Sequence, residues 1–174
     1  MSGLPPESRN VIPASPSPGW GSALGFLDFN VARPETQRDA LAIHEITERV
    51  YRYGWSFDEH RADLLADCFT LNATWSGNIG GLEPLVVRQG RDGIVEWLCG
   101  FWAGQSDQRR HNMTSVSVAV ESDHRAVVHS SLLLTSANNG SLAIVLTSFY
   151  RFKLERAADI WRISSLFEGC DVAF

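Results

Sequence analysis

Apolar residues in the first half of the chain recur at steps of three and four, which is the spacing of one face of a helix. The strongest pattern predicts a helix over about 35–57, and a second helix follows over about 61–69. A third begins after the glycines and charges of 90–93, where Asp92 is a suitable N-cap. Three helices are therefore expected before residue 103.

Strand signals fill the rest of the chain. A short strand over 72–76 and a loop marked by the glycines of 77–81 are predicted between the second and third helices. After Gln108 the pattern alternates, and the Asn139-Gly140 step suits a tight hairpin. The later strands are predicted near 108–120, 125–136, 141–154 and 160–168. Helices before a run of antiparallel strands predict an α+β fold, in which helices pack on one face of a curved antiparallel sheet.

The N-terminus has a different composition. Six of the seven prolines lie within residues 1–34, which predicts a Pro-rich extension without regular elements, followed by one domain over 35–174. Apolar side chains such as Trp20 and Phe26 leave two interpretations open for this extension. It is either a disordered leader, or a segment that packs on the folded body or on a neighbouring subunit.

Charge and composition narrow the function. The net charge is −5 and no basic run stands out, so nucleic acid is not an expected partner. Lys153 is the only lysine, which argues against Schiff-base chemistry. Cys68, Cys99 and Cys170 lack the spacing of a zinc site and are expected as free thiols. With neither an export signal nor an apolar run of about 18 residues, we expect a cytoplasmic protein without a membrane partner.

Four segments, in this order, resemble the SnoaL-like family of the nuclear transport factor 2-like superfamily over about residues 36–170. The segments are Tyr53-x-x-x-x-Asp58, Asp67-Cys68-Phe69 through Trp75, Gly90-Arg91-Asp92-Gly93-Ile94, and Arg110-His111-Asn112 leading into strands that finish at Asp159-Ile160-Trp161-Arg162-Ile163. The resemblance implies a cone-shaped α+β barrel, in which the sheet curls around three helices and leaves an apolar pocket. It also implies a homodimer or homotrimer.

The same resemblance implies an activity. The family includes dehydratases, a dehydrochlorinase and polyketide cyclases, and ketosteroid isomerases are related to it. Asp58 and His111 fall at the positions of the Asp–His pair of the dehydratase and dehydrochlorinase branches, and Tyr53 matches the tyrosine of bile-acid dehydratases. Leu166 stands where the dehydrochlorinase has an arginine, which argues against that branch.

Such a pair suits elimination or isomerisation. A neutral imidazole can remove a proton next to an activating group, while a carboxylate on the other ring nitrogen fixes the tautomer and offsets the new charge. We therefore predict His111 as the base, Asp58 as its partner, and Tyr53 as a hydrogen-bond donor to a substrate oxygen. This chemistry requires no metal or organic cofactor. The remaining predicted pocket residues are Trp55, Phe57, Trp75, Trp102, Asn112, His129, Ser148 and Tyr150.

Plainer roles are open for each catalytic candidate: Asp58 as the cap of the second helix, His111 as a satisfied strand histidine, and Tyr53 as a core aromatic. The favoured function is a cofactor-independent, dehydratase-like lyase or isomerase acting on a small, hydrophobic, cyclic metabolite. The alternatives are a polyketide-type cyclase, a non-catalytic ligand-binding module, and a protein resembling the β-subunit of a dioxygenase.

Overall fold

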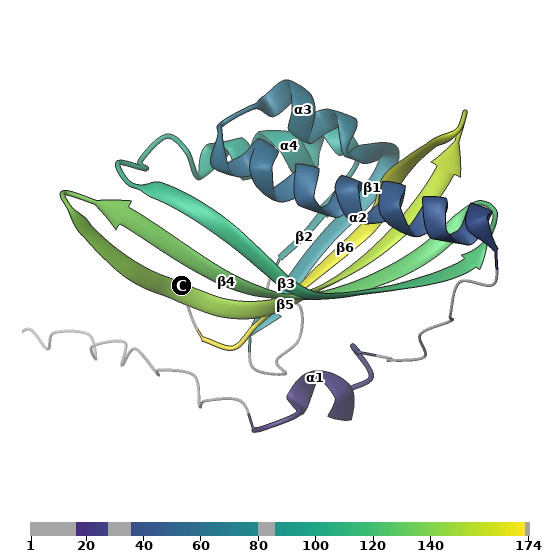
Figure 1. Ribbon diagram of the computed structural model, residues 1–174. Coiled ribbons are helices and arrows are strands. Elements are labelled where there is room, and N and C mark those ends of the chain that lie inside the picture. Colours follow the sequence, from purple (N-terminus) through teal and green to yellow (C-terminus); the bar gives the residue numbers. More distant parts are fainter. Residues whose placement is uncertain (1–16, 28–35, 80–85, 173–174) are drawn as a thin grey trace, which may run out of the picture.

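The computed structural model describes residues 17–27, 36–79 and 86–172. A layer of helices lies on the concave face of one curved sheet, and the N-terminal segment lies on the opposite face (Figure 1). The fold is α+β with the helices at one end of the chain, as the pattern of apolar residues predicts.

The three main helices lie close to their predicted positions. They are α2 (Gln37–Asp58), α3 (Ala62–Asp67) and α4 (Arg91–Gly100). Thr36 begins α2 with a capping box, because its hydroxyl accepts from the Asp39 N–H while the Asp39 carboxylate accepts from the Thr36 N–H. The prediction that Asp92 caps α4 is wrong. Gly90 is the N-cap, with φ at 78°, and its N–H donates to the Ala73 carbonyl at 2.8 Å, which ties the helix start to the sheet.

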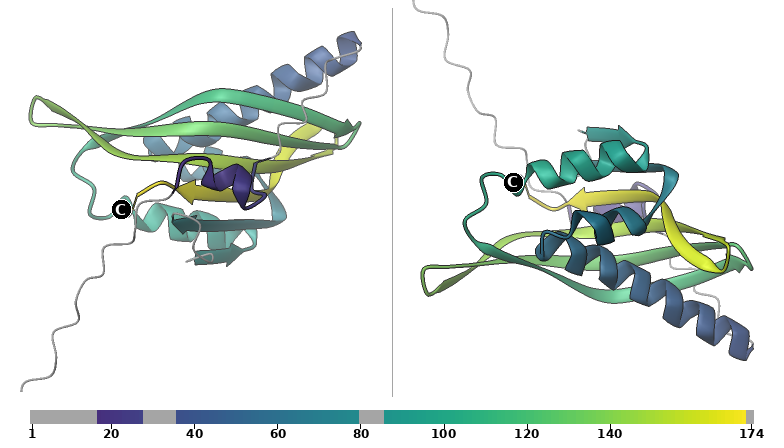
Figure 2. Two further views of the ribbon diagram at one scale, coloured as in Figure 1. Left: turned by 90° about the horizontal axis from the view of Figure 1, so that it is seen from below. Right: turned by 90° about the horizontal axis from the view of Figure 1, so that it is seen from above.

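Six strands form the sheet. They are β1 (Phe69–Ile79), β2 (Val86–Gln89), β3 (Gln108–Ser122), β4 (Arg125–Asn138), β5 (Ser141–Ala157) and β6 (Ile160–Cys170), in the order β2-β1-β6-β5-β4-β3. Four of the neighbouring pairs are antiparallel, whereas β1 and β6 run parallel. Over the described ranges β2 and β3 form the two edges, so the sheet is curved but not closed (Figure 2).

The predicted loop at Gly77 is wrong, because β1 continues through it to Ile79. Gly77 pairs with Val86 on one side and with Glu168 on the other, and this double pairing holds the backbone extended. A Cβ at Gly77 would lie 2.8 Å from the indole of Trp75, so the glycine makes room for that ring.

The core lies between α2 and the concave face of the sheet. Ile46, Val50 and Tyr53 of α2 are at most 2% exposed, and Phe152 and Ile163 on the sheet are fully buried. The amphipathic stripe predicted from the sequence is thus the face that α2 buries, and its removal from water is the main force that fixes α2 on the sheet.

One carboxylate ties two helices to the sheet. Asp67 at the end of α3 accepts from Arg49 of α2 at 2.9 Å and from Arg162 of β6 at 2.8 Å. Partial burial opposes ionisation of Asp67, but the bonds from Arg162 and Arg49 prevail and lower its pKa.

The segment 17–27 packs on the convex face of the sheet, where α1 (Trp20–Ala23) lies (Figure 2). Trp20 contacts Phe149 with ring centroids 5.1 Å apart, and its indole N–H donates to Asp171 Oδ1 at 2.8 Å. Phe26 stacks on Phe167 with centroids 4.5 Å apart. The prediction of no regular element before Pro34 is therefore wrong, because tertiary packing of Trp20 stabilises a helical turn that its composition does not suggest. Residues 1–16 and 28–35 of the predicted extension lie outside the described residues.

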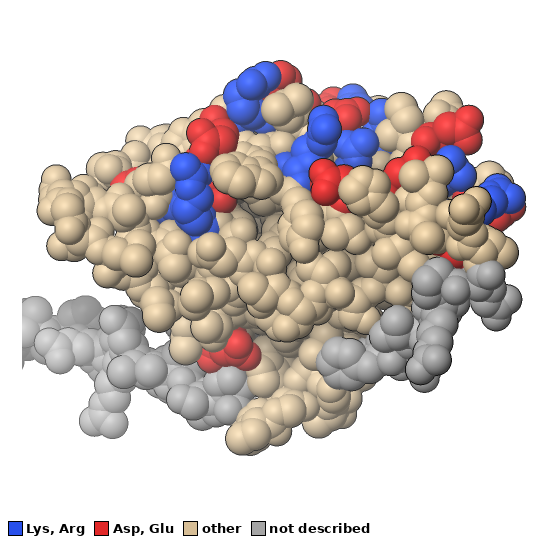
Figure 3. All heavy atoms as spheres, viewed as in Figure 1, with Lys and Arg blue, Asp and Glu red and all other residues tan. Residues whose placement is uncertain are grey.

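Among the described helices, none combines the length and the apolar character needed to cross a membrane. On the face seen in Figure 3, acidic and basic side chains are intermixed over the helices, and the sheet side below them is largely uncharged.

Candidate active site

Asp58 and His111 meet in the structure, although 53 positions separate them. The ring Nδ1 of His111 lies 2.5 Å from Asp58 Oδ1, and the backbone N–H of His111 donates to Asp58 Oδ2 at 2.8 Å. Their side chains are 7% and 5% exposed. Because a carboxylate only accepts hydrogen bonds, Nδ1 carries a proton, and in the neutral imidazole Nε2 is the nitrogen that keeps its lone pair.

Gly54 allows this pair to form. It lies one helical turn before Asp58 on α2, at the point where β3 crosses the helix. A Cβ built on Gly54 would lie 3.3 Å from His111 Cβ and 3.2 Å from Met113 Cε, which is tighter than ordinary contact. The absence of a side chain therefore lets the end of α2 approach β3 closely enough for the Asp58 carboxylate to reach the backbone N–H and the ring Nδ1 of His111.

The plainer role for Asp58 does not describe the structure. Arg61 is the N-cap of α3, and α3 has no side-chain cap hydrogen bond, so Asp58 does not cap it. His111 is a histidine of strand β3 whose ring Nδ1 is bonded to Asp58, as its plainer role expects, and it also lines a cavity.

The cavity has a volume of about 420 Å³ and lies between the helices and the concave face of the sheet. Its wall is largely aromatic and aliphatic, with a few polar groups. The lining residues are Tyr53, Phe57, Trp75, Trp97, Leu98, Phe101, Arg109, His111, Leu134, Val145, Leu146, Tyr150 and Glu168. Five residues predicted from the sequence are therefore among them: His111, Tyr53, Phe57, Trp75 and Tyr150.

Tyr53 is a buried aromatic residue of the cavity wall. It is 2% exposed, and its ring meets those of Phe69, Tyr150 and His111 edge to face. Burial raises the pKa of Tyr53 far above its ordinary value, and the nearby Glu168 carboxyl acts in the same direction. Tyr53 therefore keeps its proton and can act as a hydrogen-bond donor, but not as a base.

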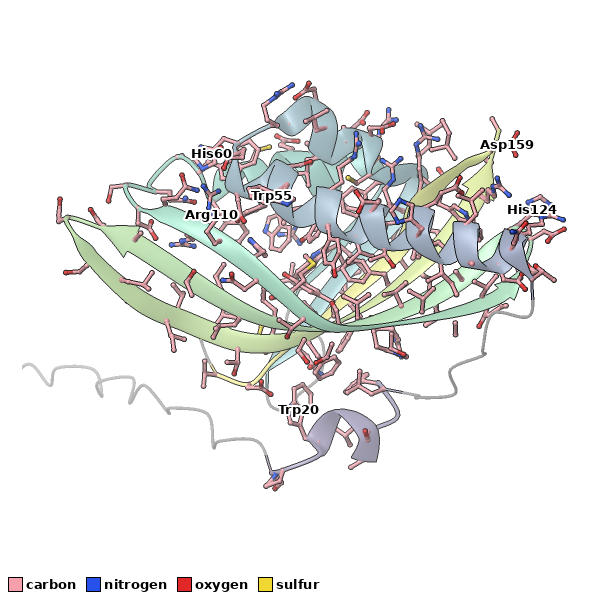
Figure 4. All side chains as sticks on the ribbon, in the orientation of Figure 1. Trp20, Trp55, His60, Arg110, His124 and Asp159 are labelled. Carbon is pink, nitrogen blue, oxygen red and sulfur yellow. The ribbon has the colours of Figure 1, made fainter. Side chains whose placement is uncertain are left out.

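Two of the other predicted pocket residues lie on the opposite side of the pair. Trp55 is 60% exposed, and the Arg110 guanidinium lies 5.5 Å from its ring centre. Figure 4 labels the two side chains, which lie next to each other. Asn112 donates to the Leu133 carbonyl at 3.1 Å and so supports the pairing of β3 with β4. Trp55 and Asn112 line a separate hollow of about 220 Å³, and Asp58 and His111 also form part of its wall.

Three more predicted pocket residues do not line the main cavity. Trp102 stacks on His60 with centroids 4.7 Å apart and supports Phe57 from outside. His129 is buried, but it alternates with Val128, which faces the core, and so belongs to the other face of β4. Ser148 is also buried, and its hydroxyl donates to Glu168 Oε1 at 3.3 Å.

Glu168 and Arg109 are polar cavity residues that the sequence did not single out. Burial raises the pKa of Glu168 above its ordinary value, while a positive charge on His111 when it is protonated and hydrogen bonding by Ser148, Tyr150 and Cys170 act in the opposite direction. The Arg109 guanidinium donates to Asp107 Oδ2 at 3.2 Å. Glu168 is thus a carboxyl group with a raised pKa in the same cavity as His111.

No group of three or more His, Cys, Asp or Glu side chains in the described ranges is arranged to hold a metal ion. The three cysteines are free, and Cys68 and Cys170 are buried. What the cavity offers chemically is an oriented imidazole, a carboxyl group and two tyrosines in a mostly apolar wall.

Comparisons with solved structures identify the same fold elsewhere. A proposed scytalone dehydratase from Novosphingobium aromaticivorans is 16% identical, with a TM-score of 0.66 over 76% of this chain and 86% of that chain. The β-subunit of a proposed aromatic-ring-hydroxylating dioxygenase from the same organism is 13% identical, with a TM-score of 0.67 over 78% and 92%. Aln2 from a Streptomyces species is 21% identical, with a TM-score of 0.65 over 81% and 94%.

No curated protein matches the sequence. The sequence itself matches the SnoaL-like domain over residues 38–166, which run from the second residue of α2 to Leu166 in β6. Three observations agree with this match: the mixed curved sheet, the helices on its concave face, and the cavity between them. The chain belongs to the SnoaL-like domain family.

Proposed function

We propose that this protein is a cofactor-independent enzyme of the lyase or isomerase type, with His111 as the base. The observation that carries the proposal is the hydrogen bond between His111 Nδ1 and Asp58 Oδ1, at 2.5 Å, together with the position of His111 in the cavity wall. This bond fixes the tautomer in which Nε2 can accept a proton from a bound molecule.

The surroundings of the pair suit proton abstraction. Once His111 takes up a proton, the Asp58 carboxylate lies beside the resulting imidazolium and stabilises it. Both side chains are at least nine-tenths buried, so water screens this attraction only weakly. Tyr53, which keeps its proton, can donate a hydrogen bond to the carbonyl oxygen on which negative charge develops.

The cavity indicates the kind of substrate. A volume of about 420 Å³ falls within the range of roughly 300–1,000 Å³ usual for small-molecule sites. Trp75, Trp97 and Phe101 contribute flat aromatic wall, which favours a ring over a flexible chain. We therefore propose a small, cyclic, mostly apolar substrate with a carbonyl group next to the carbon that loses its proton.

Solvent exchange tests this function with simple ketones in place of the natural substrate. A panel of cyclic ketones is incubated with the protein in deuterated water, and deuterium incorporation next to the carbonyl is followed by NMR. The wild-type protein should accelerate incorporation for ketones that fit the cavity. His111→Gln should lose at least about a hundredfold, since a general base typically contributes 10²–10⁴-fold.

His124→Gln is the matched control. His124 is an exposed histidine at the other end of the sheet from Trp55 and Arg110, as Figure 4 shows, so its replacement should leave exchange unchanged. Equal exchange rates in wild-type protein and His111→Gln would contradict the assignment of the base.

A non-catalytic role is the second candidate, favoured by the likeness to the dioxygenase β-subunit, whose TM-score is 0.67. It predicts that ligands bind in the cavity but that wild-type protein exchanges no proton of any ketone. A polyketide-type cyclase would begin with the same proton transfer and would differ in the carbon–carbon bond that follows. A homodimer or homotrimer stays a prediction.

A further inference from the structure

We propose that Glu168 is a second catalytic residue, which acts as the general acid opposite His111 and protonates an oxygen that leaves the substrate. This role rests on the proposed function, because it assigns the partner of the same proton abstraction. The residue belongs to β6, whereas His111 belongs to β3, so the two groups reach the cavity from strands that are not neighbours in the sheet.

The position of Glu168 is built by three strands. It pairs with Tyr150 of β5 on one side and with Gly77 of β1 on the other, in the middle of the sheet. Its side chain lines the cavity together with Tyr150 and His111. The hydroxyl of Ser148 donates to Oε1 at 3.3 Å, which orients the carboxyl group from the β5 side.

The groups that face Glu168 are His111 from β3, Tyr53 from α2, Ser148 and Tyr150 from β5, and Cys170 from β6. Hydrogen bonding by Ser148, Tyr150 and Cys170, and a positive charge on His111 when its ring is protonated, favour the ionised form of Glu168, whereas burial favours its neutral form. Arg109 is the only arginine among the described lining residues, and its guanidinium is engaged by Asp107. Burial therefore dominates and raises the pKa of Glu168, so the carboxyl group retains a proton to a higher pH than a solvated glutamate.

A neutral carboxylic acid and a neutral imidazole complete an elimination without any other reactant. His111 Nε2 takes the proton from the carbon next to the carbonyl, and the electron pair of that C–H bond forms the new double bond. The bond to the β-oxygen breaks as this oxygen takes the Glu168 proton, and water departs. Transfer of a proton from the imidazolium back to the carboxylate restores both groups.

Because His111 acts as the base and Glu168 as the acid, loss of the acid should affect the elimination rate differently for different leaving groups. A hydroxyl leaves poorly unless it is protonated, whereas acetate leaves without a proton. The probes are therefore β-hydroxycyclohexanone and β-acetoxycyclohexanone, which give the same cyclohexenone, measured by its ultraviolet absorbance. Glu168→Gln keeps the shape of the side chain and removes the acid.

Glu168→Gln should lose at least about a hundredfold with the hydroxy probe, as expected for a general acid, and keep its rate with the acetoxy probe within a few fold. With wild-type protein, the rate for the hydroxy probe should fall as the pH rises through the pKa of Glu168, and the acetoxy rate should not share this fall. His111→Gln should lose activity with both probes. Equal losses of Glu168→Gln on the two probes, or no loss on either, would overturn the assignment.

The protonation state can be measured separately from activity. Infrared difference spectra between wild-type protein and Glu168→Gln, recorded as the pH rises, should keep the carbonyl band of a protonated carboxyl group to a higher pH than spectra between wild-type protein and Glu155→Gln, which replaces an exposed glutamate of β5. Loss of the Glu168 band at or below the pH at which the Glu155 band is lost would refute the acid role even if the base assignment holds. Inactivity of wild-type protein on both probes and in ketone exchange would instead refute the proposed function, and the acid role with it.

Discussion

Replacement of Asp58 by asparagine should switch the tautomer of His111. In the wild-type protein, Asp58 Oδ2 accepts from the backbone N–H of His111 at 2.8 Å and Oδ1 faces ring Nδ1 at 2.5 Å. An asparagine has one oxygen and one NH₂ group, and only its oxygen can accept from the backbone N–H. The NH₂ group is then left facing Nδ1, which must become the acceptor, so the proton of the ring moves to Nε2.

The consequence for catalysis follows from the position of that proton. A protonated Nε2 has no lone pair for the substrate, and the imidazolium would also lose its neighbouring carboxylate. The same substitution in a Ser-His-Asp triad lowers turnover about 10⁴-fold through the wrong tautomer, so Asp58→Asn should lower ketone exchange by roughly 10³–10⁴-fold. The fold should survive, because both hydrogen bonds are kept, the one between the side chains with its direction reversed.

Nitrogen-15 NMR of the histidine side chains measures this switch directly. In wild-type protein the His111 signal should be that of a ring protonated on Nδ1, and in Asp58→Asn that of a ring protonated on Nε2. The five histidines can be separated by assigning His111 through His111→Gln. An unchanged tautomer in Asp58→Asn, or unchanged exchange with a switched tautomer, would refute the reasoning.

Two further substitutions test the packing that supports the site. Gly54→Ala should stabilise α2 by up to about 1 kcal/mol through helix propensity, which thermal melts would measure. The same substitution should lower the rate of ketone exchange roughly tenfold to a hundredfold, because the added Cβ displaces His111. Full exchange activity of Gly54→Ala, measured by NMR, would contradict the close approach of α2 to β3. Trp20→Ala should release the segment 17–27 from Phe149, since loss of a buried tryptophan costs about 3–5 kcal/mol. Limited proteolysis should then cut within this segment sooner than in wild-type protein, and unchanged cleavage would show that Trp20 does not hold it.

The sequence alone predicts the helices and the main strands because their periodicity reports burial directly. Every third or fourth residue of α2 faces the core, as does every second residue along β3 to β6. This spacing can be recognised without knowing which element packs against which. The parallel pairing of β1 with β6 has no such signal. It is a long-range choice of neighbour, as is the continuation of β1 through Gly77, where a glycine otherwise indicates a turn.

The site was only partly predictable for a related reason. Asp58, His111 and Tyr53 could be found from the family resemblance. Glu168 could not, because the alternation of buried and exposed residues at the start of β6 predicts that Glu168 faces away from the core. Starting at Trp161 and Ile163, which are buried, a strict period of two would put Glu168 on the opposite face. A register shift in the pairing of β5 with β6 inserts one residue and turns Leu166 and Glu168 inward.

Aromatic residues were the least predictable part of the cavity. Trp55 and Trp75 have the same composition signal, yet one is 60% exposed and the other is 4% exposed. Trp55 lies off the apolar face of α2, and Trp75 belongs to β1. For the aromatic residues of the α4 region, the angle at which the helix crosses the sheet decides which of them line the cavity, and no local pattern encodes that angle. Trp97 and Phe101 of the α4 region line the cavity for this reason, whereas Trp102 supports it from outside.

A crystal structure with a bound cyclic ketone or its enol analogue tests the role of the His111–Asp58 pair most directly. The geometry predicts that the ring of the ligand occupies the cavity between Trp75 and Tyr150, with its reacting carbon next to His111 Nε2 and with the bond from Nδ1 to Asp58 intact. A ligand bound in the cavity with Nε2 turned away from it, or with the bond to Asp58 absent, would contradict the assignment of His111 as the base.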